Sequence, residues 1–178
     1  MMFLILILIL LIILMAVLAF FLISLAFYWL KLGVPFAVSR TDLIEKLIKE
    51  VSLEEGKVFY DLGSGDGNFL YYLAKKHPKV RFVGYELNFA LYLFSRFFCR
   101  INNLSFYRQN FFNINLRNAD YLYLFLFPEV MNRLLPKLKK ELKTGAVVIA
   151  NSFQFDGLRS EKIFPSEKRL GTIYLYKF

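Results

Sequence analysis

The stretch VFYDLGSGDGNFL, residues 58 to 70, has a spacing of residue types that suits close contact with a ligand. An apolar run reaches Asp61 and then gives way to glycines at positions 63, 65 and 67. Glycine lets the chain turn sharply and lets the backbone approach a bound molecule. A P-loop would end in Gly-Lys-Ser/Thr, and a dinucleotide loop would need glycine at position 68, which is Asn here. Asp61 would also repel a phosphate, so phosphate binding is a poor fit.

A ligand with cationic and hydroxyl groups fits the acidic residues better. S-adenosylmethionine carries an amino-acid head, a sulfonium, a ribose and an adenine, but no phosphate. Glu86, in VGYELN, is placed to accept hydrogen bonds from both ribose hydroxyls. Asn110 and Phe111, in RQNFF, offer contacts to the adenine amine and ring. The alternative, a plain tight turn with surface acids, does not explain a second acid at the end of the next strand.

The segments around these residues alternate between strand and helix patterns. Strands are expected at 57–63, 80–86, 104–108, 119–127, 146–152 and 171–178, with another near Ile163. Helices are expected at 41–51, 67–77, 88–101 and 129–143, with Asn88 as an N-cap and a kink or break at Pro136. This order predicts an α/β fold: a mostly parallel, Rossmann-like sheet with helices on both faces and a C-terminal antiparallel hairpin.

The N-terminus predicts a membrane anchor. Residues 1 to 30 are uncharged and apolar apart from Ser24, and as a helix they would extend roughly 45 Å, more than a bilayer core requires. A cleaved signal peptide is the alternative, but it would begin with basic residues and end in a small-residue cleavage site. We therefore expect an anchor at 1–31, a connector at 32–40 and a catalytic domain at 41–178.

The charge pattern predicts how the anchor is oriented. The net charge is +9, and every charged residue follows the apolar segment. The positive-inside tendency places the N-terminus outside and the domain in the cytoplasm, or on the inner side of the mitochondrial inner membrane in a eukaryote. The bilayer is the expected partner of the positive charge, and nucleic acid is disfavoured because no nucleic-acid motif accompanies it. With one His and one Cys, no metal site is predicted.

The motifs resemble those of class I S-adenosylmethionine-dependent methyltransferases over residues 33 to 178. YDLGSGDG matches their first motif and GYELN their second, while the N-terminal apolar helix and GVPF resemble one branch. That branch contains small membrane-anchored protein-lysine methyltransferases of the ATP synthase c-subunit and adenine nucleotide translocase. The resemblance implies cofactor binding by Asp61, Gly63, Ser64, Gly65, Gly67, Glu86, Leu87, Asn110 and Phe111. It implies a substrate channel lined by Phe36, Phe127, Pro128, Glu129, Asn151, Ser152 and Phe153.

This chain departs from the branch in two places, which leave the substrate more open than the cofactor. AVS stands where a second proline is usual, and Asn110 where Asp is common. Methyl transfer from a sulfonium depends mainly on positioning, so no general base is assigned. Phe127 and Phe153 are either channel walls or core, and Glu129 either binds the incoming ammonium or interacts with a helix dipole. The expected substrate is a lysine of a membrane protein; alternatives are a lipophilic small molecule and a non-catalytic binding domain.

Overall fold

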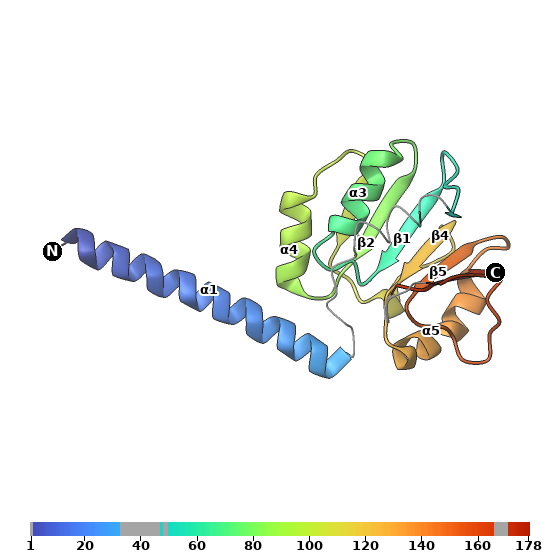
Figure 1. Cartoon of the computed structure of the whole chain (residues 1–178). Coiled ribbons are helices and arrows are strands. Elements are labelled where there is room, and N and C mark those ends of the chain that lie inside the picture. The colour runs from blue at the N-terminus through green and yellow to red at the C-terminus, as the bar shows by residue number, and fades with distance from the viewer. Residues whose placement is uncertain (1, 33–46, 48–49, 166–170) are drawn as a thin grey trace.

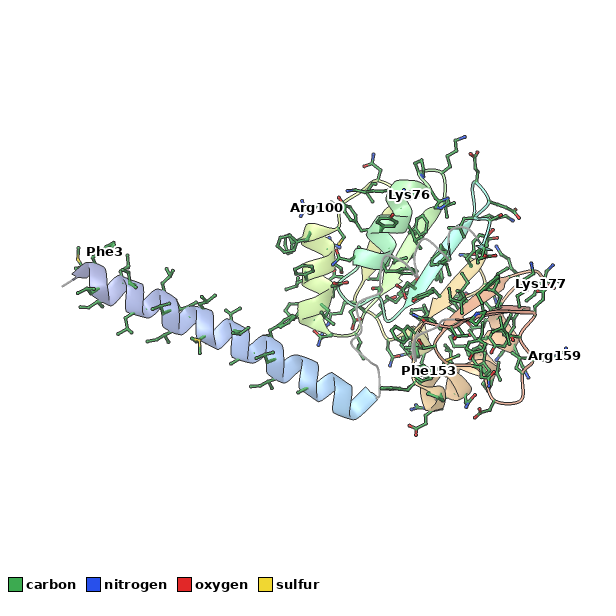
Figure 2. All side chains as sticks on the ribbon, viewed as in Figure 1. Phe3, Lys76, Arg100, Phe153, Arg159 and Lys177 are labelled. Atoms are coloured by element: carbon green, nitrogen blue, oxygen red, sulfur yellow. The ribbon has the colours of Figure 1, made fainter. Side chains whose placement is uncertain are left out.

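The computed structural model describes residues 2–32, 47, 50–165 and 171–178 (Figure 1). The predicted connector apart from Leu32, the candidate channel residue Phe36 and most of the predicted helix 41–51 lie outside these residues. Helix α1, Met2–Leu32, stands clear of the α/β domain in Figure 1. Its segment Met2–Ile23 has a mean hydropathy of 3.6 and is long and apolar enough to cross a membrane. Figure 2 shows side chains projecting from both edges of this segment, and those of Met2–Ile23 are almost all exposed.

A seven-stranded mixed sheet forms the domain, as the alternation of segments predicts. Its order is β3-β2-β1-β4-β5-β7-β6. The first five strands are parallel and the last two pair antiparallel, so the C-terminal hairpin is confirmed. The strands are β1 Val58–Leu62, β2 Arg81–Tyr85, β3 Leu104–Tyr107, β4 Tyr121–Leu124, β5 Val147–Asn151, β6 Lys162–Phe164 and β7 Ile173–Lys177. The order reverses between β1 and β4, and this switch point is where such sheets bind ligands.

Helices cover both faces of the sheet, because the central strands are apolar almost without interruption and so bury side chains on both faces. One core cluster joins Phe59 of β1 to Phe69 and Leu73 of α3, Asn68–Lys76. The other joins Leu62 of β1 to Met131 of α5, Pro128–Glu141. Helix α4, Phe89–Phe98, and a short 3-10 helix η1, Phe111–Asn113, complete the described elements. Asn88 caps α4 as expected, accepting hydrogen bonds from the amides of Ala90 and Leu91.

Two predicted elements end differently in the structure. Strand β4 stops at Leu124, because the chain must leave the sheet to enter α5, whose first residue is Pro128. Phe127 is extended, as a residue before proline prefers to be. Of the kink or break expected at Pro136, the break is wrong, since α5 runs from Pro128 to Glu141 without interruption, and the kink stays a prediction. Helix α4 also ends earlier than expected, with Cys99 as its C-cap.

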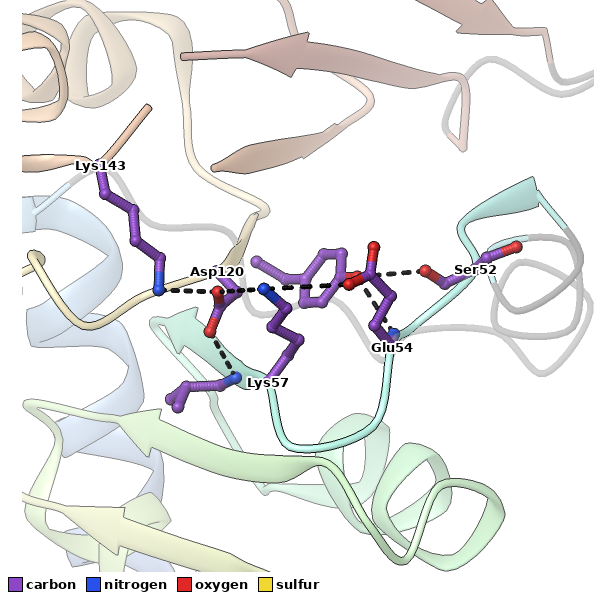
Figure 3. Close-up of polar contacts among 7 residues, drawn as sticks. Ser52, Glu54, Lys57, Asp120 and Lys143 are labelled. Carbon is purple, nitrogen blue, oxygen red and sulfur yellow. Dashed lines mark hydrogen bonds and ion pairs between the residues drawn. The ribbon is translucent and has the colours of Figure 1, made fainter. Parts of the chain in front are cut away.

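A charged cluster fastens the amino ends of β1 and β4 (Figure 3). The Asp120 carboxylate lies 2.7 Å from Lys143 Nζ and 3.5 Å from Lys57 Nζ. It also accepts a 2.9 Å hydrogen bond from the Val58 amide. Burial alone would raise the pKa of Asp120, but these hydrogen bonds and the two lysine charges outweigh burial and lower that pKa. The cluster lies at the opposite end of the parallel strands from the glycine turn, so it supports the fold rather than the site.

Candidate active site

The glycine turn follows β1 and is tied to the end of β2. The amides of Gly63 and Ser64 both donate to the Tyr85 carbonyl, at 2.8 and 3.1 Å. Gly65 and Gly67 have φ angles of 57° and 79°, in the left-handed region where a side chain is strained. The turn needs its glycines for backbone conformation, and the amides of Gly63, Gly65 and Gly67 are all used in hydrogen bonds that fix its shape.

Glu86, the first residue after β2, holds this turn in place. Its carboxylate accepts hydrogen bonds from the amides of Gly65, at 2.9 Å, and Asn88, at 2.7 Å. The half-buried Leu87 also donates its amide to this carboxylate. Burial raises the pKa of Glu86, although these three hydrogen bonds act in the opposite direction. The Glu86 side chain is therefore an acceptor at the end of β2, and its hydrogen bond to the Gly65 amide fixes the glycine turn.

Asp61 is the second acid of the site and is almost fully buried, with 4% of its surface exposed. In the sheet it lies between Gly84 of β2 and Tyr123 of β4. Burial raises the pKa of Asp61 well above its usual value, and the negative charges of Glu86 and Asp66 raise it further. A cation placed beside these acids would lower that pKa and favour the ionised form. The arrangement therefore suits a positively charged ligand.

Aromatic side chains line the same edge of the sheet, after β4 and β5. The ring of Phe153 lies 5.8 Å from that of Phe127 and 6.4 Å from that of Phe125. All three are half-buried, and Figure 2 labels Phe153. We call Phe125, Phe127 and Phe153 the aromatic wall. Because carboxyl ends of parallel strands meet at one edge, the wall shares that edge with both acids.

Asn151 and Ser152 support this wall from the end of β5. The side-chain amide nitrogen of buried Asn151 donates to the Tyr123 hydroxyl at 2.8 Å, and its side-chain oxygen Oδ1 accepts from the Ser152 hydroxyl at 2.9 Å. Ser152 has a φ of 67°, the only positive value at a non-glycine residue in the described chain. The Gly171 amide donates to its hydroxyl oxygen at 2.9 Å, which helps to hold this conformation. Strained residues held by several contacts cluster at functional sites.

The remaining predicted residues lie around this edge with distinct local roles. Asn110 caps η1, because its side-chain oxygen accepts a 3.0 Å hydrogen bond from the Phe112 amide. The ring of Phe111 lies 4.9 Å from that of Phe112. Pro128 and Glu129 are exposed in the first turn of α5, where an acid favours the helix dipole.

Comparison with known proteins decides the family of this site. The ANTKMT methyltransferase domain matches residues 61–162, which include both acids and the aromatic wall. The chain belongs to this methyltransferase family. A protein-lysine N-methyltransferase of Saccharolobus islandicus is 28% identical over 149 residues, covering 80% of this chain and 92% of that protein. The human lysine N-methyltransferase of the ATP synthase c-subunit is 33% identical over 129 residues, 70% of this chain but only 54% of the human protein.

A solved structure agrees with this family. The RNA methyltransferase of Salinibacter ruber, in complex with S-adenosyl-L-homocysteine, superposes with a TM-score of 0.73 at 25% identity, covering 79% of this chain and 93% of that one. The chain is an S-adenosylmethionine-dependent methyltransferase. Its predicted fold, family and cofactor are thereby confirmed.

The residues of the site fit S-adenosylmethionine. A Cβ built on Gly65 would meet no described atom within 4 Å, so the turn leaves a space that a side chain would occupy. The buried Ser64 hydroxyl oxygen has no hydrogen-bond partner among the described residues. Asp61 and Glu86 supply negative charge for a ligand that carries a sulfonium and an ammonium. In this family member, the glycine turn, the two acids and the segment at Asn110 would hold the cofactor.

Two residues behind the site carry contacts that sequence reasoning missed. A Cβ on Gly84, inside β2, would lie 2.6 Å from a Phe106 ring atom and 2.7 Å from the Ser64 hydroxyl oxygen. A Cβ on Gly67 would meet the same ring at 2.6 Å. Phe106 of β3 therefore fits against two glycines and supports the turn from behind. A glycine inside a strand pattern was the available signal, since it often marks a close approach.

Proposed function

We propose that this protein is a protein-lysine N-methyltransferase that modifies a membrane protein close to the bilayer surface. The observation that carries the proposal is the aromatic wall of Phe125, Phe127 and Phe153, at the same sheet edge as Asp61 and Glu86. Half-buried aromatic rings beside a cofactor site would suit the long methylene stem of a lysine. The names of the archaeal and human relatives support the same substrate class.

The chemistry asks the protein mainly for positioning and for exclusion of water. S-adenosylmethionine supplies a methyl group already activated on a sulfonium. Lysine has a solution pKa of about 10.4 and must be neutral to act as a nucleophile. Burial of the amine against the aromatic wall, near positive charge, lowers its pKa and favours the neutral form. No side chain of the described residues is therefore required as a dedicated base, and Glu129, exposed in the first turn of α5, would be available to bind an incoming ammonium.

The same proposal assigns a role to each part of the chain. Residues 1–31 anchor the enzyme, 32–40 connect, and 41–178 form the methyltransferase domain. The N-terminus lies outside and the domain is cytoplasmic, in a cell inner membrane or in a mitochondrial inner membrane. Support comes from the apolar helix Met2–Ile23 and from the location of every charge after it. A short connector would keep the site near the bilayer and raise the local concentration of embedded substrate.

The test compares membranes from cells with and without the full-length protein. After incubation with isotopically labelled S-adenosylmethionine, the masses of intact proteins and extracted lipids are measured by mass spectrometry. We expect label on a lysine of a membrane protein and none with Phe153→Ala, while Phe164→Ala, on the edge strand β6, retains activity. Label on a quinone or lipid instead would replace the proposal with the small-molecule alternative. Tight cofactor binding with no methylated product in any fraction would favour a binding domain.

A further inference from the structure

Helix α4 exposes an unusual amount of aromatic surface. Its described buried residues are Leu91 and Ser95 alone. The four phenylalanines that it presents outward are 41% to 71% exposed; they are Phe89, Phe94, Phe97 and Phe98. Rings of Phe94 and Phe98 lie 4.6 Å apart, one helical turn from each other. Exposed apolar patches of this kind mark interaction sites on soluble domains.

Arginines from α4 and from the segments after α4 and β3 lie near these rings. The Arg100 guanidinium lies 5.4 Å from the ring centre of Phe97, and that of Arg108 lies 5.0 Å from Phe89. Arg96 is exposed on the same helix, and no Asp or Glu occurs between residues 89 and 108. Figure 2 shows Arg100 at the end of α4, directed away from the sheet. We call Phe89, Phe94, Phe97, Phe98, Arg96 and Arg100 the α4 face.

We propose that the α4 face docks on the anionic surface of the bilayer in which α1 is anchored. Aromatic rings prefer the interface between headgroups and acyl chains, and each Lys or Arg beside an anionic leaflet adds attraction. The α4 face supplies both kinds of group, and the acid near it is Asp66, beside the C-cap Cys99. The proposal rests on the anchor in the proposed function, but it does not depend on the identity of the methylated residue.

The segment between α1 and the domain allows a weak interaction of the α4 face with lipid to keep the domain docked. Residues 33–46 are fourteen in number and can span at most about 50 Å, so the domain cannot leave the vicinity of the bilayer. An anchored domain needs only a modest second interaction to stay docked, because that interaction is intramolecular in effect. Asn88, the α4 N-cap, comes two residues after Glu86, and the helix is about 15 Å long. Docking would hold the active site within roughly one such helix length of the headgroups and would select substrate lysines at that height.

Single-tryptophan variants test this docking in the full-length protein. Trp29, the only tryptophan, reports on α1 in the wild type. Phe98→Trp in a Trp29→Phe background reports on the α4 face. Ile163→Trp in the same background is the control, because Ile163 is 54% exposed on β6, at the far edge of the sheet. Each protein is reconstituted into phosphatidylcholine vesicles with and without phosphatidylglycerol, and tryptophan emission is measured with lipids that carry a quencher near the headgroup.

We expect quenching of the Phe98→Trp protein in the vesicles that contain phosphatidylglycerol, and little for Ile163→Trp. Quenching of Trp29 without quenching at position 98 would overturn the α4 proposal while supporting the anchor, and equal quenching at 98 and 163 would also overturn it. Absence of Trp29 quenching would contradict the anchor. Quenching of the Phe98→Trp protein would then still show whether the α4 face contacts lipid. Methylation measured separately on a soluble lysine peptide distinguishes failure of docking from failure of the proposed function.

Charge substitutions provide a second test. The pair Arg96→Gln and Arg100→Gln should lower the ratio of docked to undocked domain by roughly 30-fold, since each basic residue at an anionic leaflet contributes about a fivefold factor. The matched pair Lys139→Gln and Lys140→Gln removes the same charge from exposed positions on α5 and should leave the ratio nearly unchanged. Equal effects of the two pairs would show general electrostatic attraction and would overturn a specific α4 face.

Discussion

The Glu86 carboxylate accepts a 2.9 Å hydrogen bond from the Gly65 amide, so an acid at the end of β2 fixes the turn that follows β1. Amides of Leu87 and Asn88 also donate to it. A carboxylate has about four acceptor sites, so these amides leave little capacity for a ligand unless one of them is released. Glu86 therefore couples the shape of the glycine turn to whatever binds at the strand end.

Substitution of Glu86 should weaken the cofactor site without unfolding the domain. Glu86→Ala removes the hydrogen bond that fixes the Gly65 amide and also removes an acceptor for the ribose hydroxyls. Hydrogen bonds to charged groups contribute about 1.5–3 kcal/mol each. We expect the dissociation constant for S-adenosylmethionine to rise more than tenfold by calorimetry. Hydrogen exchange at the Gly65 amide should also accelerate. An unchanged dissociation constant would remove Glu86 from the site.

Gly65 and Gly67 should respond differently to alanine. Both have positive φ, which costs a side chain roughly 1–2 kcal/mol. A Cβ on Gly65 meets no described atom within 4 Å, whereas one on Gly67 would overlap Phe106 and Ser95. Gly65→Ala should therefore keep the fold and lose cofactor affinity, while Gly67→Ala should lower the free energy of unfolding by about 3 kcal/mol. Chemical denaturation and calorimetry on both variants separate the two effects, and similar stability losses would contradict this distinction.

Asp61→Asn should raise stability and lower affinity at the same time. The folded-state pKa of Asp61 is raised, chiefly by burial and then by Glu86 and Asp66, so its stabilising contribution exists at low pH and is lost as pH rises through that pKa. Ionisation of this buried side chain therefore weakens the ligand-free fold as pH rises. The neutral amide should increase the free energy of unfolding by about 0.5–2 kcal/mol. Thermal unfolding without ligand, near pH 7, measures this gain.

The same substitution removes a charge that a cationic cofactor needs. We expect S-adenosylmethionine affinity of the wild type to fall as pH is lowered through the raised pKa of Asp61, and this dependence to flatten in Asp61→Asn. A variant that is less stable than the wild type at neutral pH and binds the cofactor equally well would contradict both statements. A buried acid at this position lowers the stability of the ligand-free fold but strengthens binding of a cationic ligand.

Much of the site follows from local sequence patterns. Asp61 and Glu86 end neighbouring parallel strands, so periodicity and the turn residues alone place them at one edge. The N-cap at Asn88 and the antiparallel C-terminal strands were equally readable. These features depend on residues close together in the chain, where propensity and hydrogen-bonding rules are strongest.

Contacts between distant segments could not be predicted in the same way. Asn151 donates to the Tyr123 hydroxyl across 28 positions, a pairing set by the register of β4 and β5. Asn103 illustrates the same limit: its amide nitrogen lies 2.9 to 3.1 Å from the carbonyl oxygens of Ala74, His77 and Val80. An asparagine in a loop carries no local sign of that role. Helix α5 also continues through Pro136, so this proline does not end the helix as its type predicts.

Asp120 should govern part of the acid sensitivity of the fold. Its carboxylate forms ion pairs with Lys143 and Lys57 and accepts a hydrogen bond from the Val58 amide (Figure 3). These contacts outweigh the effect of burial and lower the pKa of Asp120. A depressed folded-state pKa gives stability that is present above the unfolded value of about 3.9 and is lost as pH falls through the folded value. Asp120→Asn should therefore lower the free energy of unfolding by about 2 kcal/mol at pH 7 and by less near pH 3. Urea unfolding at both pH values makes the comparison, with Asp156→Asn, an exposed acid near α5, as the control. A loss that is the same at pH 3 and pH 7 would show that the contribution comes from shape and neutral hydrogen bonds rather than from the charge.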